Sequence, residues 1–530
     1  MSVQRVPVLV VGGAYTGLTT ALSLAARGVR PLLVERRTAI STLPKAWGLN
    51  TRSQELLNTL PGVAERIRAA IADAQWPRMS HGTSLADPER QYLDPPLEPD
   101  PQELSSVPPL AWISQARVEE ILRASAEEAG AEVRLGTEMI SLVQDEEKVT
   151  ATLREASTGH EYAVEADYLV AADGNMSPTR HMVGIGVQGG GVIGHMYVIT
   201  FEADLTRYVK DAVEVIGMPG SGCSFILDGS ERHTLWVDYF PERGETPEDF
   251  TEQRCVDRIR RAIGDPDIDI TFINARFFPI NHKLADRFRE GRVFLAGDSA
   301  HACPPNGGQG GNLAIQDAYD LSWRLALVLT GQAGPDLLDM YEVERRPVID
   351  ITLKREVELA KVSEGRVPAS YNPADPHAPI PTPKEFLGFR YRSPAIGTEA
   401  DDDGSVQEDP WHPTGRPGGR APHVALTDGP GEISTHDLFG HGFVLLAGRE
   451  APGWVAAAEK VARKLGVTLA AHRIGDRYAD SDDLWCTRYG IAPDGAALIR
   501  PDAVVTWRAK TAADDLEGAL TTALSHALTR

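Results

Sequence analysis

The chain has 530 residues, a formal net charge of −22, 24% charged and 42% hydrophobic residues, and four cysteines without a C-x-x-C pair. This length predicts two or three domains of a soluble globular protein, and the negative charge disfavours nucleic acid or an anionic membrane surface as partner. With no 18-residue apolar run, no signal-like N-terminus and no metal or disulfide pattern, we expect a cytoplasmic protein without a bound metal.

The first 35 residues predict a strand–helix–strand unit. Residues 6–11 form a continuous apolar run, as in a strand buried on both faces, and residues 17–27 carry apolar side chains at helical spacing. A second apolar strand ends at Glu35. Such a unit of about thirty residues is the usual context of a dinucleotide-binding glycine motif.

The turn in this unit has glycines at positions 12, 13 and 17, but Ala14 stands where the G-x-G-x-x-G pattern has its second glycine. An altered motif of this kind also fits an ordinary strand-to-helix turn. Glu35, 23 residues after Gly12, favours a nucleotide, because an acidic side chain there can bind a ribose diol.

The next segment predicts a helix over 45–75, a proline-rich irregular stretch, and a helix in "SQARVEEILRASAEEAG", with Ser114 as N-cap and Gly130 as stop. Alternating strands follow. In "DYLVAADGNMSPTR" a buried strand runs into Asp173, Gly174, Ser177 and Arg180. An Asp-Gly pair alone also fits a hairpin turn, although the full spacing is more specific.

After a β-rich region over 190–280, "GRVFLAGDSAHACPPNGGQGGNLAIQD" predicts a strand that ends at Asp298, a glycine-rich loop, and a helix over 312–330. Glycines there let backbone N–H groups approach an anionic ligand at a helix start. We interpret His301 as structural. Residues 367–385 and 399–410 predict linkers or surface loops, and a separate βα pattern follows, with a last helix over 513–528.

These three motifs, in this order, resemble the class A FAD-dependent aromatic hydroxylases of the para-hydroxybenzoate hydroxylase fold. The stretches "FLGFRYRS", "PTGRPGGRAPHV" and "YGIAPDGAALIRPDAVVTWR" resemble the polyketide-tailoring branch, which includes aklavinone and tetracenomycin hydroxylases. The resemblance implies an α/β fold with a Rossmann-like FAD-binding domain, a β-sheet substrate domain and a thioredoxin-like C-terminal domain. We expect the FAD-binding domain over 1–180, with an irregular insertion at 75–110, and again over 281–400. The substrate domain would span 181–280 and the C-terminal domain 401–530.

The resemblance also implies the residues around a noncovalent FAD. The first turn would lie under the pyrophosphate, Glu35 at the adenosine ribose, Asp298 at the ribityl chain and Pro305 beside the isoalloxazine. Lys45 stands where the branch has an arginine, and it keeps the charge but not the planar fork. The full implied set is Gly12, Gly13, Ala14, Gly17, Glu35, Arg36, Lys45, Gln115, Arg117, Asp173, Asp298, Pro305, Gly310, Gly311 and Asn312.

The implied reaction uses NADPH or NADH and O2, and a C4a-hydroperoxyflavin hydroxylates a polycyclic aromatic polyketide of the anthracycline or tetracenomycin type. Trp47, Trp236 and Tyr239 are predicted to line the substrate pocket, with core packing as the alternative for each. No catalytic base is evident. Baeyer–Villiger insertion and a non-catalytic flavin-binding relic stay open, whereas the W-x-W-x-I-P stretch of flavin halogenases is absent. We expect a monomer or homodimer.

Overall fold

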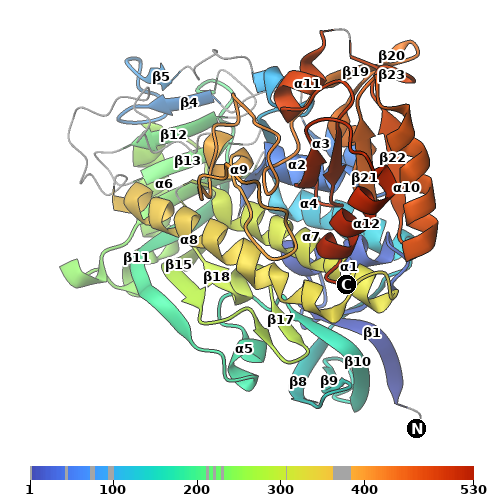
Figure 1. Ribbon diagram of the computed structural model, residues 1–530. Coiled ribbons are helices and arrows are strands. Elements are labelled where there is room, and N and C mark those ends of the chain that lie inside the picture. The colour runs from blue at the N-terminus through green and yellow to red at the C-terminus, as the bar shows by residue number, and fades with distance from the viewer. Residues whose placement is uncertain are drawn as a thin grey trace.

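A computed structural model describes residues 3–41, 46–71, 78–93, 101–209, 214–218, 223–227, 232–305, 307–361, 383–480 and 482–530. Within these ranges the fold is mixed α/β and consists of two large sheets and a C-terminal unit (Figure 1). None of the helices in these ranges is long and apolar enough to cross a membrane.

The first sheet carries the predicted strand–helix–strand unit. Its strand order is β16-β17-β10-β1-β2-β7, with β1 parallel to both β10 and β2, and with β8 and β9 attached through β10. Apolar residues of β1 and β2 are fully buried, as the continuous apolar runs predict. The strands are β1 (Gln4–Val11), β2 (Leu32–Glu35), β7 (Glu132–Leu135), β8 (Thr137–Gln144), β9 (Val149–Glu155), β10 (Glu161–Ala171), β16 (Arg289–Glu290) and β17 (Val293–Leu295).

Helices cover this sheet, and α1 is enclosed by its neighbours. Every residue of α1 is buried, because the helix packs against both α4 and α7. Ser114 caps α4 as predicted, accepting a hydrogen bond from Arg117 N–H. The helices of this unit are α1 (Tyr15–Ala25), α2 (Thr51–Asn58), α3 (Val63–Ala70), α4 (Gln115–Glu128), α5 (Pro178–Met182), α7 (Gln309–Leu329) and α8 (Met340–Lys361).

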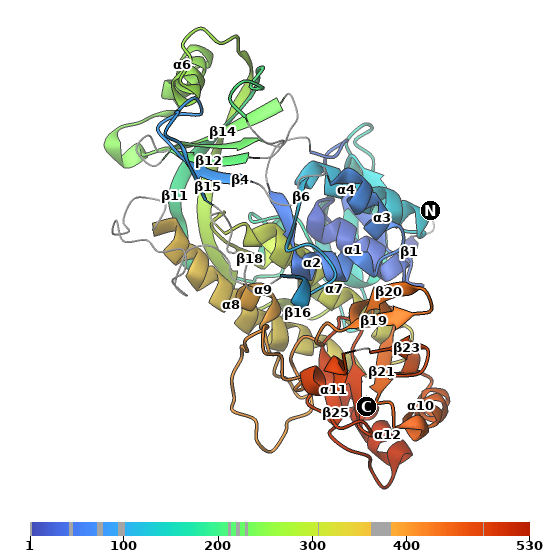
Figure 2. The ribbon, with the colours of Figure 1, turned by 90° about the horizontal axis from the view of Figure 1, so that it is seen from above.

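The second sheet has the order β18-β15-β11-β14-β13-β12-β4-β5, and helix α6 (Glu252–Ile263) packs on one face. In Figure 2 the helix α8 and the first unit lie on the other side of this sheet. Its strands are β4 (Arg78–His81), β5 (Gln91–Leu93), β11 (Val187–Glu202), β12 (Glu214–Met218), β13 (Cys223–Leu227), β14 (Arg232–Asp238), β15 (Thr271–Ala285) and β18 (His301–Ala302).

The expected irregular insertion at 75–110 differs from the structure in part. Strand β4 pairs in parallel with β12, about 135 positions later in the chain, and β5 pairs with β4. Strand β3 (Trp47–Asn50) lies within the range 45–75, for which the sequence predicts a helix, and it pairs with β6 (Leu110–Ser114), which directly precedes α4. These strands are stabilised by distant hydrogen-bonding partners, which local sequence pattern does not report.

The C-terminal unit is built around the sheet β22-β21-β24-β25, with the small sheet β20-β19-β23 beside it. Strand β21 is parallel to β22 and antiparallel to β24, and β24 is antiparallel to β25. A short helix, α9 (Pro383–Leu387), precedes this unit and contacts α2. The elements of the unit are β19 (Ala425–Asp428), β20 (Gly431–Ser434), β21 (Phe443–Ala447), α10 (Pro452–Leu465), β22 (Leu469–Arg473), β23 (Tyr478–Ala479), α11 (Leu484–Tyr489), β24 (Ala496–Ile499), β25 (Val505–Ala509) and α12 (Leu516–Ala527).

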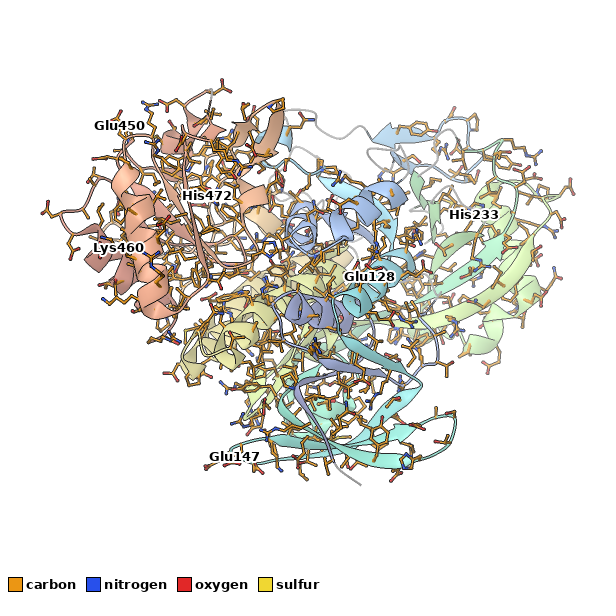
Figure 3. The ribbon with its side chains drawn as sticks, turned by 90° about the vertical axis from the view of Figure 1, so that its right-hand side faces the viewer. Glu128, Glu147, His233, Glu450, Lys460 and His472 are labelled. Carbon is orange, nitrogen blue, oxygen red and sulfur yellow. The ribbon has the colours of Figure 1, made fainter. Side chains whose placement is uncertain are left out.

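Seen from the side, the C-terminal unit with Lys460 and His472 and the second sheet with His233 stand at opposite ends of the molecule (Figure 3). The first unit, with Glu128, lies between them. Buried ion pairs join the C-terminal unit to α8: Arg500 Nη1 lies 2.8 Å from Glu344 Oε2, and both side chains are fully buried. Because breaking a buried pair leaves an unpaired charge in the interior, this contact fixes the two parts to each other.

Candidate functional site

The turn after β1 is shaped by two glycines that tolerate no side chain. Gly12 has φ of +116°, and a Cβ on it would lie 2.1 Å from the carbonyl oxygen of Ala172. A Cβ on Gly17 would lie 1.8 Å from the carbonyl oxygen of Gly12. The turn is therefore packed directly against the end of β10, where the Asp173 motif begins.

Helix α1 begins immediately after this turn, and its first N–H groups are available to a ligand. Ala14 is the N-cap, and among the described residues no side chain caps this end. Leu18 N–H is the first to bond within the helix, to the carbonyl oxygen of Ala14. Ala14 has φ of −103°, which any L-residue adopts, so glycine is not required there by backbone conformation. An uncapped helix start beside a glycine turn fits a phosphate group.

Glu35 lies at the end of β2 and is tied to the same turn. Its Oε2 accepts the N–H of Gly13 at 2.7 Å, and its Oε1 accepts the N–H of Arg37 at 2.9 Å. The carboxylate is thus held beside the turn, where the sequence predicts a ribose. The next predicted residue, Arg36, is exposed, and Lys45 lies outside the described residues.

The Asp173 carboxylate is hydrogen-bonded within its own loop. One carboxylate oxygen accepts the hydroxyl of Ser177 at 2.5 Å, and the other accepts the N–H of Thr179 at 2.9 Å, which closes the start of α5. The buried Arg180 then donates to the carbonyl oxygen of Ser299 at 2.8 Å. This motif therefore connects the first glycine turn with the segment that carries Asp298.

Asp298 lies just after β17, in the short turn Gly297–Ser299, and its side chain is exposed. The turn is held from below by Asp317, which accepts the Gly297 N–H at 3.1 Å and lies 2.5 Å from Nε2 of the buried His301. Burial alone would raise the pKa of Asp317, but Arg345 and His301 beside it bring that pKa below its usual value. These contacts favour the structural interpretation of His301.

The start of α7 meets the start of α1. Gly308 is the N-cap of α7, with φ of +66° and no cap from a described side chain. A Cβ on Gly311 would lie 3.0 Å from Cε2 of Tyr15, the first residue of α1. Pro305, three residues after the end of the buried strand β18, leads into this loop. Two uncapped helix starts, both rich in glycine, are thereby brought together.

Asn312 supports this junction with its side chain rather than presenting it to a ligand. Its Oδ1 accepts the N–H of Asn50 at 2.9 Å, and its Nδ2 donates to the carbonyl oxygen of Gly308 at 2.9 Å. The side-chain amide is therefore engaged within the protein, and only the backbone here is open to a flavin. These bonds also hold β3, with Trp47, beside the α7 start.

The two predicted residues of α4 make local contacts. Gln115 donates to Glu119 Oε1 at 2.5 Å, and its backbone N–H bonds the carbonyl oxygen of Ala46 at 3.0 Å. Arg117 is exposed and pairs with Glu120 at 2.9 Å. The structure thus brings Gln115 near the β3 region, whereas the Arg117 guanidinium lies in a surface ion pair.

The second sheet separates the predicted aromatic residues. Tyr239 packs with Tyr197 and Phe250 in the core under α6, and its hydroxyl donates to the carbonyl oxygen of Glu245 at 3.1 Å. Side chains alternate along a strand, so Trp236 lies on the opposite face from Val237. Tyr239 therefore lies in the core under α6, which is the core-packing alternative for this residue, and it does not share a face of the sheet with Trp236. The placement of Trp236 in a substrate pocket stays a prediction.

The face of the second sheet away from α6 carries Val198, Thr200, Trp236, Asn274 and Phe278, as the strand register shows, and we call it the open face. Three buried polar atoms on it have no hydrogen-bond partner among the described residues: Trp236 Nε1, Thr200 Oγ1 and Asn274 Oδ1. Because buried polar atoms are normally paired, this face is suited to a ligand with its own polar groups.

Trp47 lies beside the α7 start and stacks on Trp112, with ring centroids 5.9 Å apart. Both indole nitrogens are buried without a partner among the described residues. Trp112 was not predicted from the sequence. Its only signal is its position in a short strand just before the helix at 114–130.

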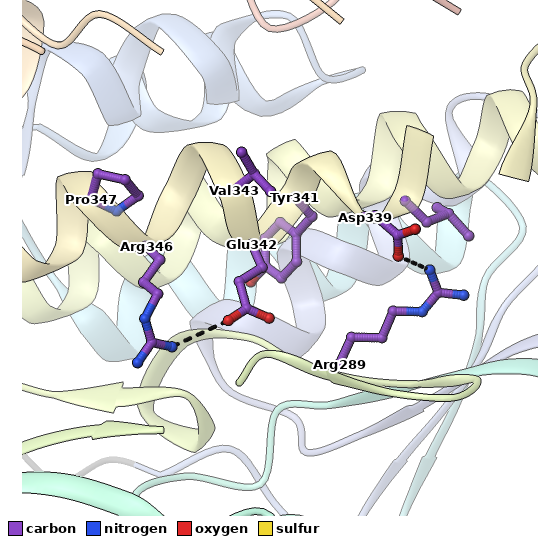
Figure 4. Close-up of a pocket in the computed structure, with 8 residues that line it drawn as sticks. Arg289, Asp339, Tyr341, Glu342, Val343, Arg346 and Pro347 are labelled. Atoms are coloured by element: carbon purple, nitrogen blue, oxygen red, sulfur yellow. Dashed lines mark hydrogen bonds and ion pairs between the residues drawn. The ribbon is translucent and has the colours of Figure 1, made fainter. Parts of the chain in front are cut away.

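A surface pocket of about 360 Å³ along α8 is a separate feature (Figure 4). Its charged groups neutralise each other, since Arg346 pairs with Glu342 at 3.3 Å and Arg289 pairs with Asp339. None of the predicted site residues lines it. We therefore place the functional site at the glycine turns and the open face instead.

Comparison with known proteins gives the same picture. Residues 5–356 match the model of a family described as an FAD binding domain, and residues 414–529 match the C-terminal domain of aromatic-ring hydroxylases. The chain is 40% identical to aklavinone 12-hydroxylase of Streptomyces purpurascens, over 98% of this chain and 99% of that one. It is 38% identical to 4-methyl-5-nitrocatechol 5-monooxygenase of a Burkholderia species, over 99% and 98% of the two chains.

Among solved structures, the chain resembles a ternary complex of aklavinone-11 hydroxylase with FAD and aklavinone. The TM-score is 0.91 and the sequence identity 38%, and both chains are covered completely. The similarity therefore includes both large sheets and the C-terminal unit.

Proposed function

We propose, from the premise that this chain belongs to the family of FAD-dependent aromatic-ring hydroxylases, that it hydroxylates a polycyclic aromatic polyketide. Membership rests on a family model that covers more than half of the chain and on a 40% identical relative that spans nearly all of it. The predicted family is confirmed, and the chain is an FAD-dependent monooxygenase.

The convergence of the two uncapped helix starts carries the proposal for the cofactor. The α1 start would hold the pyrophosphate, Glu35 the adenosine ribose and Asp298 the ribityl chain, while the glycines of the α7 start would lie at the flavin ring. The residues present fit FAD, because glycines leave room for close backbone approach and N–H groups remain to bind anionic oxygens. When bound, FAD supplies the redox chemistry that activates O2 with electrons from NADPH or NADH.

The open face carries the proposal for the substrate. It combines the apolar side chains of Val198, Trp236 and Phe278 with polar ones, and its unpaired polar atoms are an indole N–H, a hydroxyl and an amide oxygen. A fused-ring polyketide with phenol and carbonyl groups offers both an extended apolar surface and matching hydrogen-bond partners. The protein's part is to orient the reacting ring and to exclude water from it.

A second candidate substrate is a small substituted catechol. It is favoured by the 38% identical relative named for 4-methyl-5-nitrocatechol, whose match covers 99% of this chain. Fold and cofactor site do not separate the two, because substrate choice depends on the side chains of the open face.

The experiment is turnover with NADPH or NADH, labelled O2 and two substrate panels, one of anthracycline and tetracenomycin-type polycycles and one of substituted catechols. We expect one labelled oxygen in a polycycle and consumption of reductant stimulated by it. Turnover of catechols alone would replace the first candidate by the second. Ring expansion of the product would indicate Baeyer–Villiger insertion, and binding of FAD without turnover in either panel would indicate a non-catalytic flavoprotein.

Two further proposals concern the C-terminal unit and the assembly. The order β21, α10, β22, α11, β24, β25, α12, with its one parallel strand pair, supports a thioredoxin-like unit. We give it a structural role, since the sequence has no C-x-x-C pair. A cytoplasmic monomer or homodimer that binds neither nucleic acid nor membrane is the assembly we propose.

A further inference from the structure

A buried carboxyl group on α8 contacts the glycine loop that precedes α7. Glu356 Oε2 accepts the N–H of Gly307 at 2.7 Å, and the Glu356 residue is fully buried. A Cβ on Gly307 would lie 2.0 Å from Glu356 Oε1, so this oxygen takes the space that a side chain at 307 would need. Oε1 has no hydrogen-bond partner among the described residues.

The surroundings of Glu356 leave it as the group that changes charge near neutral pH. Burial and the nearby Glu385 raise the pKa of Glu356 to about 7, against the opposing effects of the Gly307 N–H and Arg355. Arg355 and Glu385 of α9 form an ion pair with each other. Burial, together with the charges of Glu356 and Asp298, raises the pKa of the Cys303 thiol, which therefore stays neutral.

Such a carboxyl is costly for stability. It gives up its hydration on burial, and only one N–H donor of the described chain compensates for the loss. The group lies where its effect on a flavin would be large, because Gly307 directly precedes the α7 start, whose glycines lie at the flavin ring in the proposed function. Charges in a buried site act over several ångströms with little screening.

We propose that Glu356 is a positioning residue for FAD: it fixes the glycine loop through Gly307 and places a negative charge that lowers the reduction potential of the bound flavin. This proposal rests on the proposed function for the location of FAD. Reduction adds electrons to the flavin, so a nearby negative charge disfavours the reduced form relative to the oxidised form.

The first test is the midpoint potential of the FAD-loaded variant Glu356→Gln. Glutamine keeps the shape and an acceptor for the Gly307 N–H but removes the charge. We expect the FAD dissociation constant to stay within about threefold of the native value. At a pH well above 7, where the native carboxyl is charged, reduced flavin should gain about tenfold over oxidised flavin, which for a two-electron couple is a rise of about 30 mV. The exposed Glu358 on the same helix gives the matched control Glu358→Gln, for which we expect the native potential.

The pH dependence of the flavin potential distinguishes the proposed role from a purely structural one, because a purely structural residue would not change it. Reduction of a nearby flavin raises the pKa of the carboxyl, so Glu356 takes up a proton on reduction in the pH range between its pKa values with oxidised and with reduced flavin. In that range, which begins near pH 7 and extends upward, the potential should change more steeply with pH, and at lower pH the native and Glu356→Gln potentials should converge. The Glu356→Gln variant should lack this change of slope and the Glu358→Gln control should keep it.

The second test is a double-mutant cycle on FAD affinity, which does not depend on any single variant. Gly307→Ala alone should weaken FAD binding at least tenfold, because its Cβ meets Glu356 Oε1. In the Glu356→Ala background, Gly307→Ala should weaken FAD binding by a factor at least fivefold smaller than in the native background, because the space that the Cβ needs is then free. Folding of each variant is checked by its thermal unfolding.

The outcomes separate this inference from the proposed function. A chain that takes up no FAD overturns both. A chain that binds FAD and hydroxylates its substrate, yet shows the native potential in Glu356→Gln and additive effects in the cycle, overturns the role of Glu356 alone. A raised potential with additive effects would likewise overturn the part of the proposal that concerns the loop.

Discussion

The glycine turns and the open face differ in what they offer a ligand. The turns present backbone N–H groups at two helix starts, in a geometry that Gly12 and Gly17 make possible. The open face presents side-chain atoms from strands whose residues are 36 to 80 positions apart in the chain. A backbone site can serve the same cofactor throughout a family, whereas a side-chain site can change its ligand by a few substitutions. This difference is consistent with relatives named for substrates as different as aklavinone and a nitrocatechol.

The largest effect should come from a side chain placed inside the turn. Gly17→Ala puts a Cβ 1.8 Å from the backbone oxygen of Gly12, and the turn cannot shift without leaving β10. We expect FAD binding to weaken at least a hundredfold, about 2.7 kcal/mol, in fluorescence titrations of the purified protein. The matched control is Gly431→Ala, where the nearest atom would lie 3.6 Å away. Equal affinities in the two variants would break the assignment of this turn to FAD.

The next effect separates a ligand contact from a structural one. Asp298→Ala should weaken FAD binding by about tenfold to a hundredfold, because a charged hydrogen-bond partner is lost, with the unfolding temperature little changed. His301→Ala should lower the unfolding temperature more than Asp298→Ala does, since it leaves the buried Asp317 without one of its partners. The reverse pattern in titration and thermal unfolding would contradict both roles.

A smaller effect should test the open face against the core beneath α6. Trp236→Phe removes the unpaired indole N–H and should raise the KM for the substrate about threefold to tenfold, with the FAD affinity unchanged. Tyr239→Phe also removes one hydrogen-bond donor, but one that bonds the carbonyl oxygen of Glu245, so its KM should stay native. A larger KM change for Tyr239→Phe than for Trp236→Phe in steady-state kinetics would contradict the placement of the substrate on the open face.

The smallest effect concerns the altered glycine position. Ala14 has an ordinary φ and caps α1 only with its backbone, so the methyl group is tolerated rather than required. Ala14→Gly should therefore bind FAD within about threefold of the native affinity, or more tightly. A loss of tenfold or more in the same titration, about 1.4 kcal/mol, would show that the loop is built around this methyl group.

The local sequence was enough to predict the glycine turns of the proposed cofactor site because the parts of these turns are local. Strand β1, the turn, α1 and Glu35 fall within 35 residues, and each is specified by apolar runs, glycines or an acidic strand end. The motifs at Asp173 and Asp298 follow the same rule, with a buried strand leading into a turn. The resemblance of the three motifs to those of known flavin enzymes led us to expect that these turns surround one FAD.

Only the tertiary structure decided what depends on distant partners. Strand β4 forms because β12 offers it a free edge, and Tyr239, which follows the end of β14, packs in the core under α6 while Trp236 of β14 faces the other side of the sheet. The amide of Asn312 is engaged by a strand about 260 positions earlier, and Glu356 reaches Gly307 across 49 residues. Hydrogen bonds between such partners depend on how the sheets and helices pack, and no periodicity in the chain records that packing.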